Sequence, residues 1–199
     1  MEPDLPIPFH DTDDIEELGA AAFLHVEQPA PGSPERYGAL LFINARGEPL
    51  EFVYNRIELL SDILWRPIDR ARSAVRRLAV TLFHEARHRP ALLFCRADVV
   101  DPHLFGPTGQ VTLEIPVGRI ATMSEAVGYA GAEERQTIET ADSAGEIQDT
   151  HVFWTPGPPA GAAADLFTRL AQRGLLLEPF ERAGEGLRVV FGDPLGSRK

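Results

Sequence analysis

The stretch PIDRARSAVRRLAVTLFHEARHRPALLFCRAD, residues 67–98, decides the fold class, because it places a helix directly before a buried strand. Proline is tolerated at the first position of a helix and interrupts its interior, so Pro67 and Pro90 bound a predicted helix at about residues 67–88. The run ALLFCRAD (91–98) does not alternate, which predicts a strand buried on both faces. The apolar stripe of the helix recurs at steps of three and four, and consists of Ile68, Ala71, Val75, Leu78, Ala79, Leu82 and Ala86.

The segments on either side of this unit predict further strands and a second helix. YGALLFIN (37–44) and PLEFVYN (49–55) predict a hairpin, whose turn contains Gly47, a residue that tolerates positive φ. The other predicted elements are a strand at 21–27, one or two strands in QVTLEIPVGRIATM (110–123), a polar hairpin or loop at 131–149, a strand at 150–154 and a helix at 162–173.

The C-terminal segment 179–191 carries two conflicting signals. Its apolar residues have helical spacing, but Gly184 and Gly186 would each cost a helix about 1 kcal/mol, while LRVVF suits a strand. We therefore predict a hairpin there, with a helix as the alternative.

Together these elements predict an α+β (mixed α/β) fold. It consists of a sheet with an N-terminal hairpin, one long amphipathic helix packed on the sheet, and a C-terminal helix followed by a short hairpin or helix. The 199 residues, 44% of them hydrophobic, suffice for one domain with its own core. We divide the chain into a flexible lead (1–18), a main α/β domain (19–155) and a C-terminal part (156–199) packed on the same domain.

Composition restricts location and partners. The net charge of −11 disfavours unassisted binding to phosphate backbones. The start MEPDLPIPFHDTDD lacks the basic and apolar regions of a signal peptide, and no apolar run approaches the ~20 residues of a membrane span, so we expect a cytoplasmic protein. Cys95, the single cysteine, lies in an apolar run and is expected to be a small buried hydrophobe.

HEARH (84–88) matches H-E-x-x-H, the pattern of zinc hydrolases. On a helix, His84 and His88 would lie one turn apart and bind zinc, and Glu85 would accept a proton from the bound water. However, both histidines share the polar helix face with Arg70 and Arg77, whose charges disfavour a divalent ion. We therefore favour a solvated helix end over a zinc site. A third interpretation is that the Arg70 and Arg77 stripe binds an acidic partner or a phosphate.

Two further clusters are candidates for chemistry. RADVVDPH (96–103) follows the buried strand, where loops of open α/β sheets carry function, and Asp98, Asp101 and His103 offer ligands for Mg²⁺ or Mn²⁺. A simple Asp-Pro turn is the structural alternative. His25 and Glu27 lie on one side of their strand, as an acid–base pair would require.

The hairpin YGALLFINARGEPLEFVYN (37–55) and the segment LLLEPFERA (175–183) resemble a group of uncharacterised bacterial proteins with a G-x-PLEF hairpin and an LLEPFER-like C-terminus. This resemblance implies a bacterial, cytoplasmic, single-domain protein and attaches no activity to it.

Because no catalytic constellation is complete, we predict a soluble bacterial accessory or binding subunit with no catalytic site, no cofactor and an unidentified protein partner. Nucleic acid is not expected as a partner, since the arginines of RARSAVRR (70–77) split between two sides of the helix without an interleaved aromatic platform. The alternatives are a zinc-dependent hydrolase using HEARH and a divalent-metal nuclease built on Asp98 and Asp101.

Overall fold

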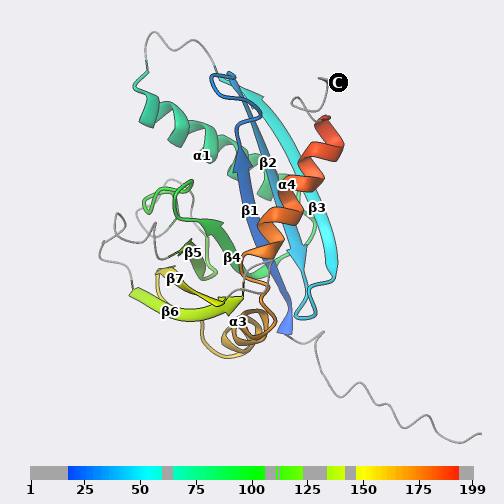
Figure 1. The fold of residues 1–199 in the computed structure, drawn as a ribbon, viewed down its shortest axis with the longest axis vertical. Helices are drawn as coiled ribbons and strands as arrows, with labels where there is room; N and C mark the ends of the chain where they lie inside the picture. The colour runs from blue at the N-terminus through cyan, green and yellow to red at the C-terminus, as the bar shows by residue number, and fades with distance from the viewer. Residues whose placement is uncertain are drawn as a thin grey trace, which may run out of the picture.

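The computed structural model describes residues 18–59, 65–105, 111, 113–122, 134–141 and 147–192. The described strands form one seven-stranded mixed sheet in the order β3-β2-β1-β4-β5-β7-β6 (Figure 1). The predicted mixed α/β class is therefore confirmed. The elements are β1 (Ala20–Glu27), β2 (Glu35–Ile43), β3 (Pro49–Glu58), α1 (Pro67–Glu85), β4 (Pro90–Arg96), β5 (Val117–Thr122), β6 (Glu134–Ala141), β7 (Ile147–Thr155), α3 (Ala162–Gln172) and α4 (Glu178–Phe191).

The directions of the strands bring the ends of three of them to the same end of the sheet. β1, β2 and β3 are antiparallel neighbours, which confirms the predicted hairpin, and its turn residue Gly47 has φ +85°. β4 lies parallel to β1 and to β5. Strands β1, β3 and β4 therefore end at the same edge of the sheet, and α1 begins at this edge and returns the chain to the start of β4.

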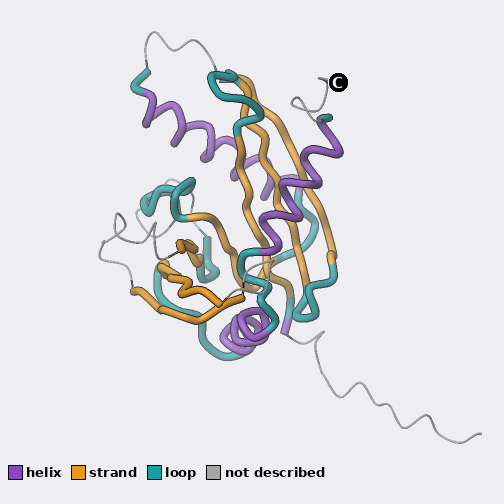
Figure 2. Tube along the Cα trace, viewed as in Figure 1, coloured by secondary structure: helices purple, strands orange, loops and turns teal. Residues whose placement is uncertain are grey.

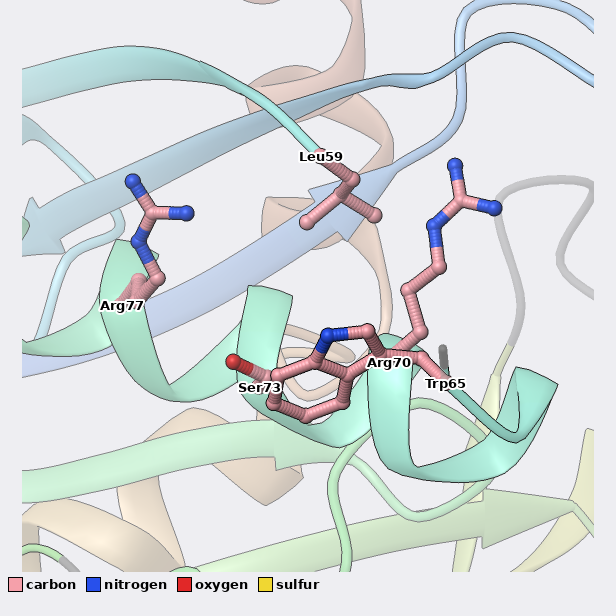
Figure 3. Close-up of a pocket in the computed structure, with 5 residues that line it drawn as sticks. All are labelled: Leu59, Trp65, Arg70, Ser73 and Arg77. Atoms are coloured by element: carbon pink, nitrogen blue, oxygen red, sulfur yellow. The ribbon is translucent and has the colours of Figure 1, made fainter. Parts of the chain in front are cut away.

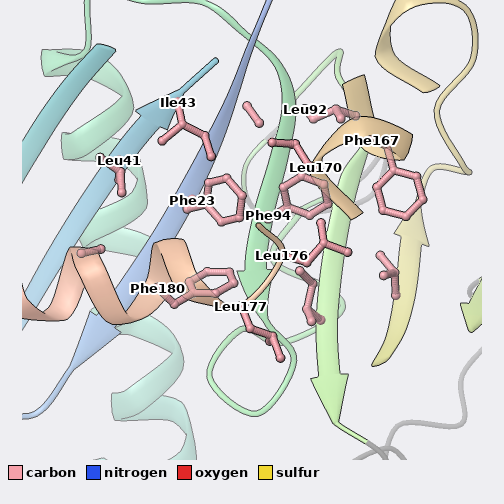
Figure 4. Close-up of a cluster of buried hydrophobic side chains, with 14 of the residues drawn as sticks. Phe23, Leu41, Ile43, Leu92, Phe94, Phe167, Leu170, Leu176, Leu177 and Phe180 are labelled. Carbon is pink, nitrogen blue, oxygen red and sulfur yellow. The ribbon is translucent and has the colours of Figure 1, made fainter. Parts of the chain in front are cut away.

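Helices cover both faces of the sheet. In Figures 1 and 2 the long strands β1–β3 pass between α1 and α4. Leu24 of β1 packs toward α1, in a cluster that includes Leu78 and Leu82. The alternate residue Phe23 points to the opposite face, where α3 and α4 complete an aromatic-rich core with Phe180 (Figure 4). Because side chains alternate along β1, this one strand contributes residues to the hydrophobic cores on both faces of the sheet.

The predicted helix at 67–88 ends earlier than expected. α1 ends at Glu85, and Ala86 already has extended backbone angles. Ile68 is 54% exposed, because the buried residues of α1 begin at Ala74 and the first turn of α1 stands clear of the sheet (Figure 1). The strand predicted at 91–98 is confirmed as β4, whose central residues, Cys95 included, are fully buried.

The hairpin predicted at 179–191 is wrong, because this segment forms α4. The two glycines are the points where the helix comes closest to the sheet. A Cβ atom at Gly184 would lie 3.2 Å from His25 Nε2, and one at Gly186 would lie 2.6 Å from Phe52 Cζ. The close packing that these glycines allow outweighs their low helix propensity.

The remaining predictions have mixed outcomes. The segment 110–123 contributes one strand, β5, among its described residues, and the polar segment before residue 150 contributes β6 and the start of β7. α3 and α4 pack on the same sheet as the rest of the chain, while the domain boundaries stay a prediction and residues 1–17 lie outside the described residues. Within the described residues, no helix has the length and apolarity needed to cross a membrane.

Candidate functional site

A cavity of about 260 Å³ lies at the carboxyl ends of β1 and β4. β1 and β4 pair up to Leu24 and Cys95, and β4 ends one residue later, while β1 continues to Glu27. The two strands therefore separate here, which is the position where open α/β sheets bind ligands. We call this space the β1–β4 cavity; it is lined by Leu24, His25, Val26, Arg96, Asp98, Val99, Phe180 and Glu181.

His25 and Glu27 form a pair beside this cavity. Because side chains alternate along a strand, residues i and i+2 share one face, and His25 Nε2 lies 3.2 Å from Glu27 Oε2. The side chains are 20% and 31% exposed, respectively, so the pair is shielded but open to solvent. Gly184 of α4 packs directly against the imidazole. A carboxylate that holds an imidazole at a cavity wall is an arrangement suited to proton transfer.

The end of β4 contributes an ion pair to the lining of the β1–β4 cavity. Arg96 Nε lies 3.3 Å from Asp98 Oδ1, and α4 adds Glu181 to the lining. The buried Arg119 of β5 donates a hydrogen bond from Nη1 to the carbonyl of Val100 at 3.2 Å. Arg119 thereby fixes the loop that follows β4.

The three candidate ligands for Mg²⁺ or Mn²⁺, Asp98, Asp101 and His103, do not line one common cavity. Asp101 and His103 line a neighbouring cavity of about 230 Å³, not the one lined by Asp98. Asp101 pairs with Arg72 of α1 at 2.6 Å, and its Oδ1 accepts a hydrogen bond from the backbone N–H of His103 at 2.9 Å. Across the part of the chain that the structure describes, no group of three or more His, Cys, Asp or Glu could hold a metal ion. Asp101 thus has the turn geometry that was the alternative prediction.

The HEARH segment does not have the helical geometry that the zinc pattern needs. His84 and Glu85 are the last residues of α1, and His88 lies beyond it in non-helical backbone. His88 Nδ1 lies 2.9 Å from Glu51 of β3, and Glu85 accepts a hydrogen bond from Asn55 at 3.5 Å. The end of α1 is therefore fixed to β3, and the predicted pair of zinc ligands one helical turn apart is not formed.

Glu51 makes this junction sensitive to pH. Burial alone would raise the pKa of its carboxyl, but hydrogen bonds from the backbone and ring of His88 and from the backbone of Arg87 lower it below 4.5. An acid whose pKa is lower in the folded protein stabilises the fold above its unfolded pKa, and this contribution disappears as pH falls through the folded value.

We expect Glu51→Gln to lower the free energy of unfolding at pH 7 by about 1–2 kcal/mol, because a carboxylate accepting several hydrogen bonds is replaced by an amide. Urea unfolding at pH 7 and at about pH 3 checks this, and the difference from wild type should shrink in acid. Glu58→Gln, at an exposed position on the same strand, is the matched control. An equal loss of unfolding free energy in both variants would contradict the stabilising role of the Glu51 hydrogen bonds.

Arg70 and Arg77 line a third cavity, on α1. The cavity measures about 60 Å³ and is lined by Leu59, Trp65, Arg70, Ser73 and Arg77, and we call it the α1 pocket. Figure 3 shows both guanidinium groups reaching the side of α1 that faces Leu59, with the indole of Trp65 and the hydroxyl of Ser73 between them. No aromatic residue interleaves the arginines within RARSAVRR (70–77), but Trp65, which precedes α1, lines the same pocket as two of them.

Three residues of these cavities were missed in the sequence. Arg96 stands at the end of a predicted strand and has no motif around it, and Glu181 lies in the segment for which the sequence favours a hairpin. Trp65 lies just before α1, outside the helical pattern, and its 51% exposure appears only in the structure. A tryptophan next to an arginine stripe was the one local signal for it.

Sequence comparison finds no matching family model and no matching curated protein. Structural comparison finds endonuclease V from Bacillus subtilis, with a TM-score of 0.55 and 12% identity, covering 88% of this chain and 82% of the other. Human endonuclease V matches with a TM-score of 0.51 and 12% identity, covering 89% and 87% of the two chains.

These neighbours change the functional interpretation. Both are nucleases by name, which overturns the prediction of an accessory, protein-binding subunit without a catalytic site and favours the nuclease alternative. The same finding overturns the expectation that nucleic acid is not a partner. The chain shares the fold of endonuclease V.

Proposed function

We propose that this protein is a nucleic-acid-processing enzyme that hydrolyses phosphodiester bonds in the β1–β4 cavity. The observation that carries the proposal is the position of this cavity. It opens where the parallel strands β1 and β4 separate, in a fold similar to that of endonuclease V, and an imidazole–carboxylate pair and a guanidinium lie at its wall.

His25 has the position of a general base in this reaction. It would accept a proton from the attacking water, whose oxygen bonds to phosphorus while the leaving oxygen departs with the P–O electron pair. Glu27, 3.2 Å from the imidazole, orients the ring and stabilises its protonated form. Arg96 lines the same cavity and offers the planar donors that suit phosphate oxygens, with Asp98 as its positioning residue.

The likeness to a nuclease also favours a divalent metal over the expectation of no cofactor, since nucleases commonly place metal ions on the reacting phosphate. The described residues do not fit such an ion, because Asp98 and Asp101 line different cavities. Neither aspartate belongs to a group of three or more His, Cys, Asp or Glu side chains, among the described residues, that could hold a metal ion. We therefore assign no step to a metal, zinc included. A cytoplasmic location and the resemblance to bacterial proteins with the G-x-PLEF hairpin belong to the same proposal.

Cleavage of labelled oligonucleotides tests the proposal. Single-stranded and duplex substrates are incubated with the purified protein, each with and without Mg²⁺ or Mn²⁺. We expect cleavage that Asp98→Asn lowers by about tenfold, since one lost charge-assisted contact of about 1.4 kcal/mol at Arg96 has that effect.

Asp165→Asn removes the same charge from the first turn of α3 and is the matched control. It should cleave like wild type, and equal rates in all three proteins would point to a contaminating nuclease and contradict the site. No cleavage of any substrate under any of these conditions would contradict the proposed activity.

A further inference from the structure

The α1 pocket combines arginine side chains with an exposed aromatic ring, and it shares no lining residue with the β1–β4 cavity. Arg70, Ser73 and Arg77 follow one another at steps of three and four, so their side chains share one stripe of α1. Leu59 closes the pocket from the end of β3. The pocket therefore lies near the edge of the sheet where β1, β3 and β4 end, the edge that also holds the β1–β4 cavity.

Arginine side chains from two elements gather near this pocket. Arg36 lies close enough to Arg70 that burial, and then repulsion from Arg70, lower the pKa of Arg36 from its ordinary value. Arg36 is held there by the carbonyls of Ser33 and Glu35, at 2.9 and 2.8 Å. Two arginines thus line the pocket and a third lies near Arg70, in a protein whose net charge is −11, and cations gathered in this way attract anions.

Trp65 gives the pocket a second kind of recognition. Its side chain is 51% exposed, although tryptophan is highly buried on average, and it lines the pocket with the two arginines (Figure 3). An exposed aromatic face beside guanidinium groups is how proteins bind single strands, with a base on the ring and the backbone phosphates on the cations.

We infer that the α1 pocket binds one nucleotide of a single-stranded nucleic acid, with its base stacked on Trp65 and its phosphate held by Arg70, Ser73 and Arg77. The 60 Å³ cavity suits a group the size of a phosphate, while the base lies on the exposed ring outside it. A duplex fits less well, because its base faces are already stacked on one another. The inference rests on the proposed function and assigns single strands as its substrate class.

Fluorescence anisotropy with a short labelled oligothymidylate tests this inference on the full-length protein. We expect Trp65→Ala to weaken binding by about 5- to 100-fold, the range of one lost base-stacking contact, and Trp65→Phe to restore most of it. Arg70→Gln and Arg77→Gln should each lower the slope of log Kd against log salt by about 0.7, the value for one phosphate contact on a single strand. Arg173→Gln, at the end of α3, is the matched charge control and should leave the slope unchanged.

Several outcomes would overturn the inference. They are unchanged binding by Trp65→Ala, equal affinity for a duplex of the same sequence, and equal competition by polyglutamate, which would indicate an acidic protein as the ligand. Trp65-dependent binding without any cleavage supports the α1 pocket and contradicts the proposed activity. If the wild-type protein cleaves oligonucleotides and Trp65→Ala binds them as tightly as wild type, the result contradicts binding at the α1 pocket but not the proposed activity.

Discussion

Replacing His25 by alanine is expected to lower the rate of oligonucleotide cleavage by about 100- to 10,000-fold, the usual effect of removing a general base. The expectation follows from the position of the imidazole, which lines the β1–β4 cavity and lies 3.2 Å from the Glu27 carboxylate. Single-turnover cleavage at saturating protein measures the chemical step separately from binding.

The controls separate a chemical role from a structural one. His25→Gln keeps a polar side chain against Gly184 and should be nearly as inactive as His25→Ala, with a melting temperature close to wild type. His84→Ala removes an exposed histidine from the HEARH segment and should cleave like wild type. If His84→Ala lost activity while His25→Ala kept it, the result would contradict the β1–β4 cavity as the site and would indicate that the reaction takes place at the end of α1.

Trp154→Ala is expected to lower the free energy of unfolding by about 3–5 kcal/mol, the range for removing a fully buried tryptophan. Trp154 lies on β7 and is 1% exposed. Its ring meets Phe167 of α3 edge to face at 5.1 Å and lies 5.9 Å from Phe94 of β4, and its Nε1 donates a hydrogen bond to Gln136 at 3.1 Å. Removing it would therefore open a cavity between the sheet and α3 and leave a hydrogen-bond acceptor without its donor.

Urea unfolding measures this loss, and the chain supplies its own control. Trp65, the other tryptophan of the chain, is half exposed, so Trp65→Ala should change the free energy of unfolding by no more than about 0.5 kcal/mol. Equal stability losses for the two substitutions would contradict the buried position of Trp154 and the packing of α3 on the sheet.

The fold was predictable where local pattern and packing agree. Leu78 and Leu82 lie on the stripe that the sequence predicts for α1, and the apolar run of β4 is buried on both faces. α4 was missed because Gly184 and Gly186 lower helix propensity locally, while the reason for their presence is contact with His25 and Phe52 on strands far away in the sequence. Tertiary contact of this kind leaves no periodic signal.

The candidate site was predictable only in pieces. His25 with Glu27 follows from strand alternation, and Asp98 follows from the rule that function gathers after buried strands. Their meeting at one cavity depends on the parallel pairing of β1 with β4, and Glu181 joins them only because α4 is a helix. HEARH misled because the helix ends at Glu85, three residues before the second histidine.

The net charge of the chain was a poor guide to its partners. The value of −11 is an average over the whole chain and does not report local potential. Arg36 comes from β2 and joins Arg70 only through the packing of α1 on the sheet. A positive patch can therefore form on an acidic protein wherever tertiary structure gathers a few guanidinium groups.

Photo-cross-linking of a single-stranded oligonucleotide, followed by peptide mapping, tests most directly whether nucleic acid reaches the edge of the sheet where β1 and β4 end. We predict cross-links in residues 24–27 and 96–99 around the β1–β4 cavity, and a second group in residues 65–77 at the α1 pocket. Cross-links confined to α3 or to the β2–β3 turn, at the opposite edge of the sheet, would contradict the assignment of the site.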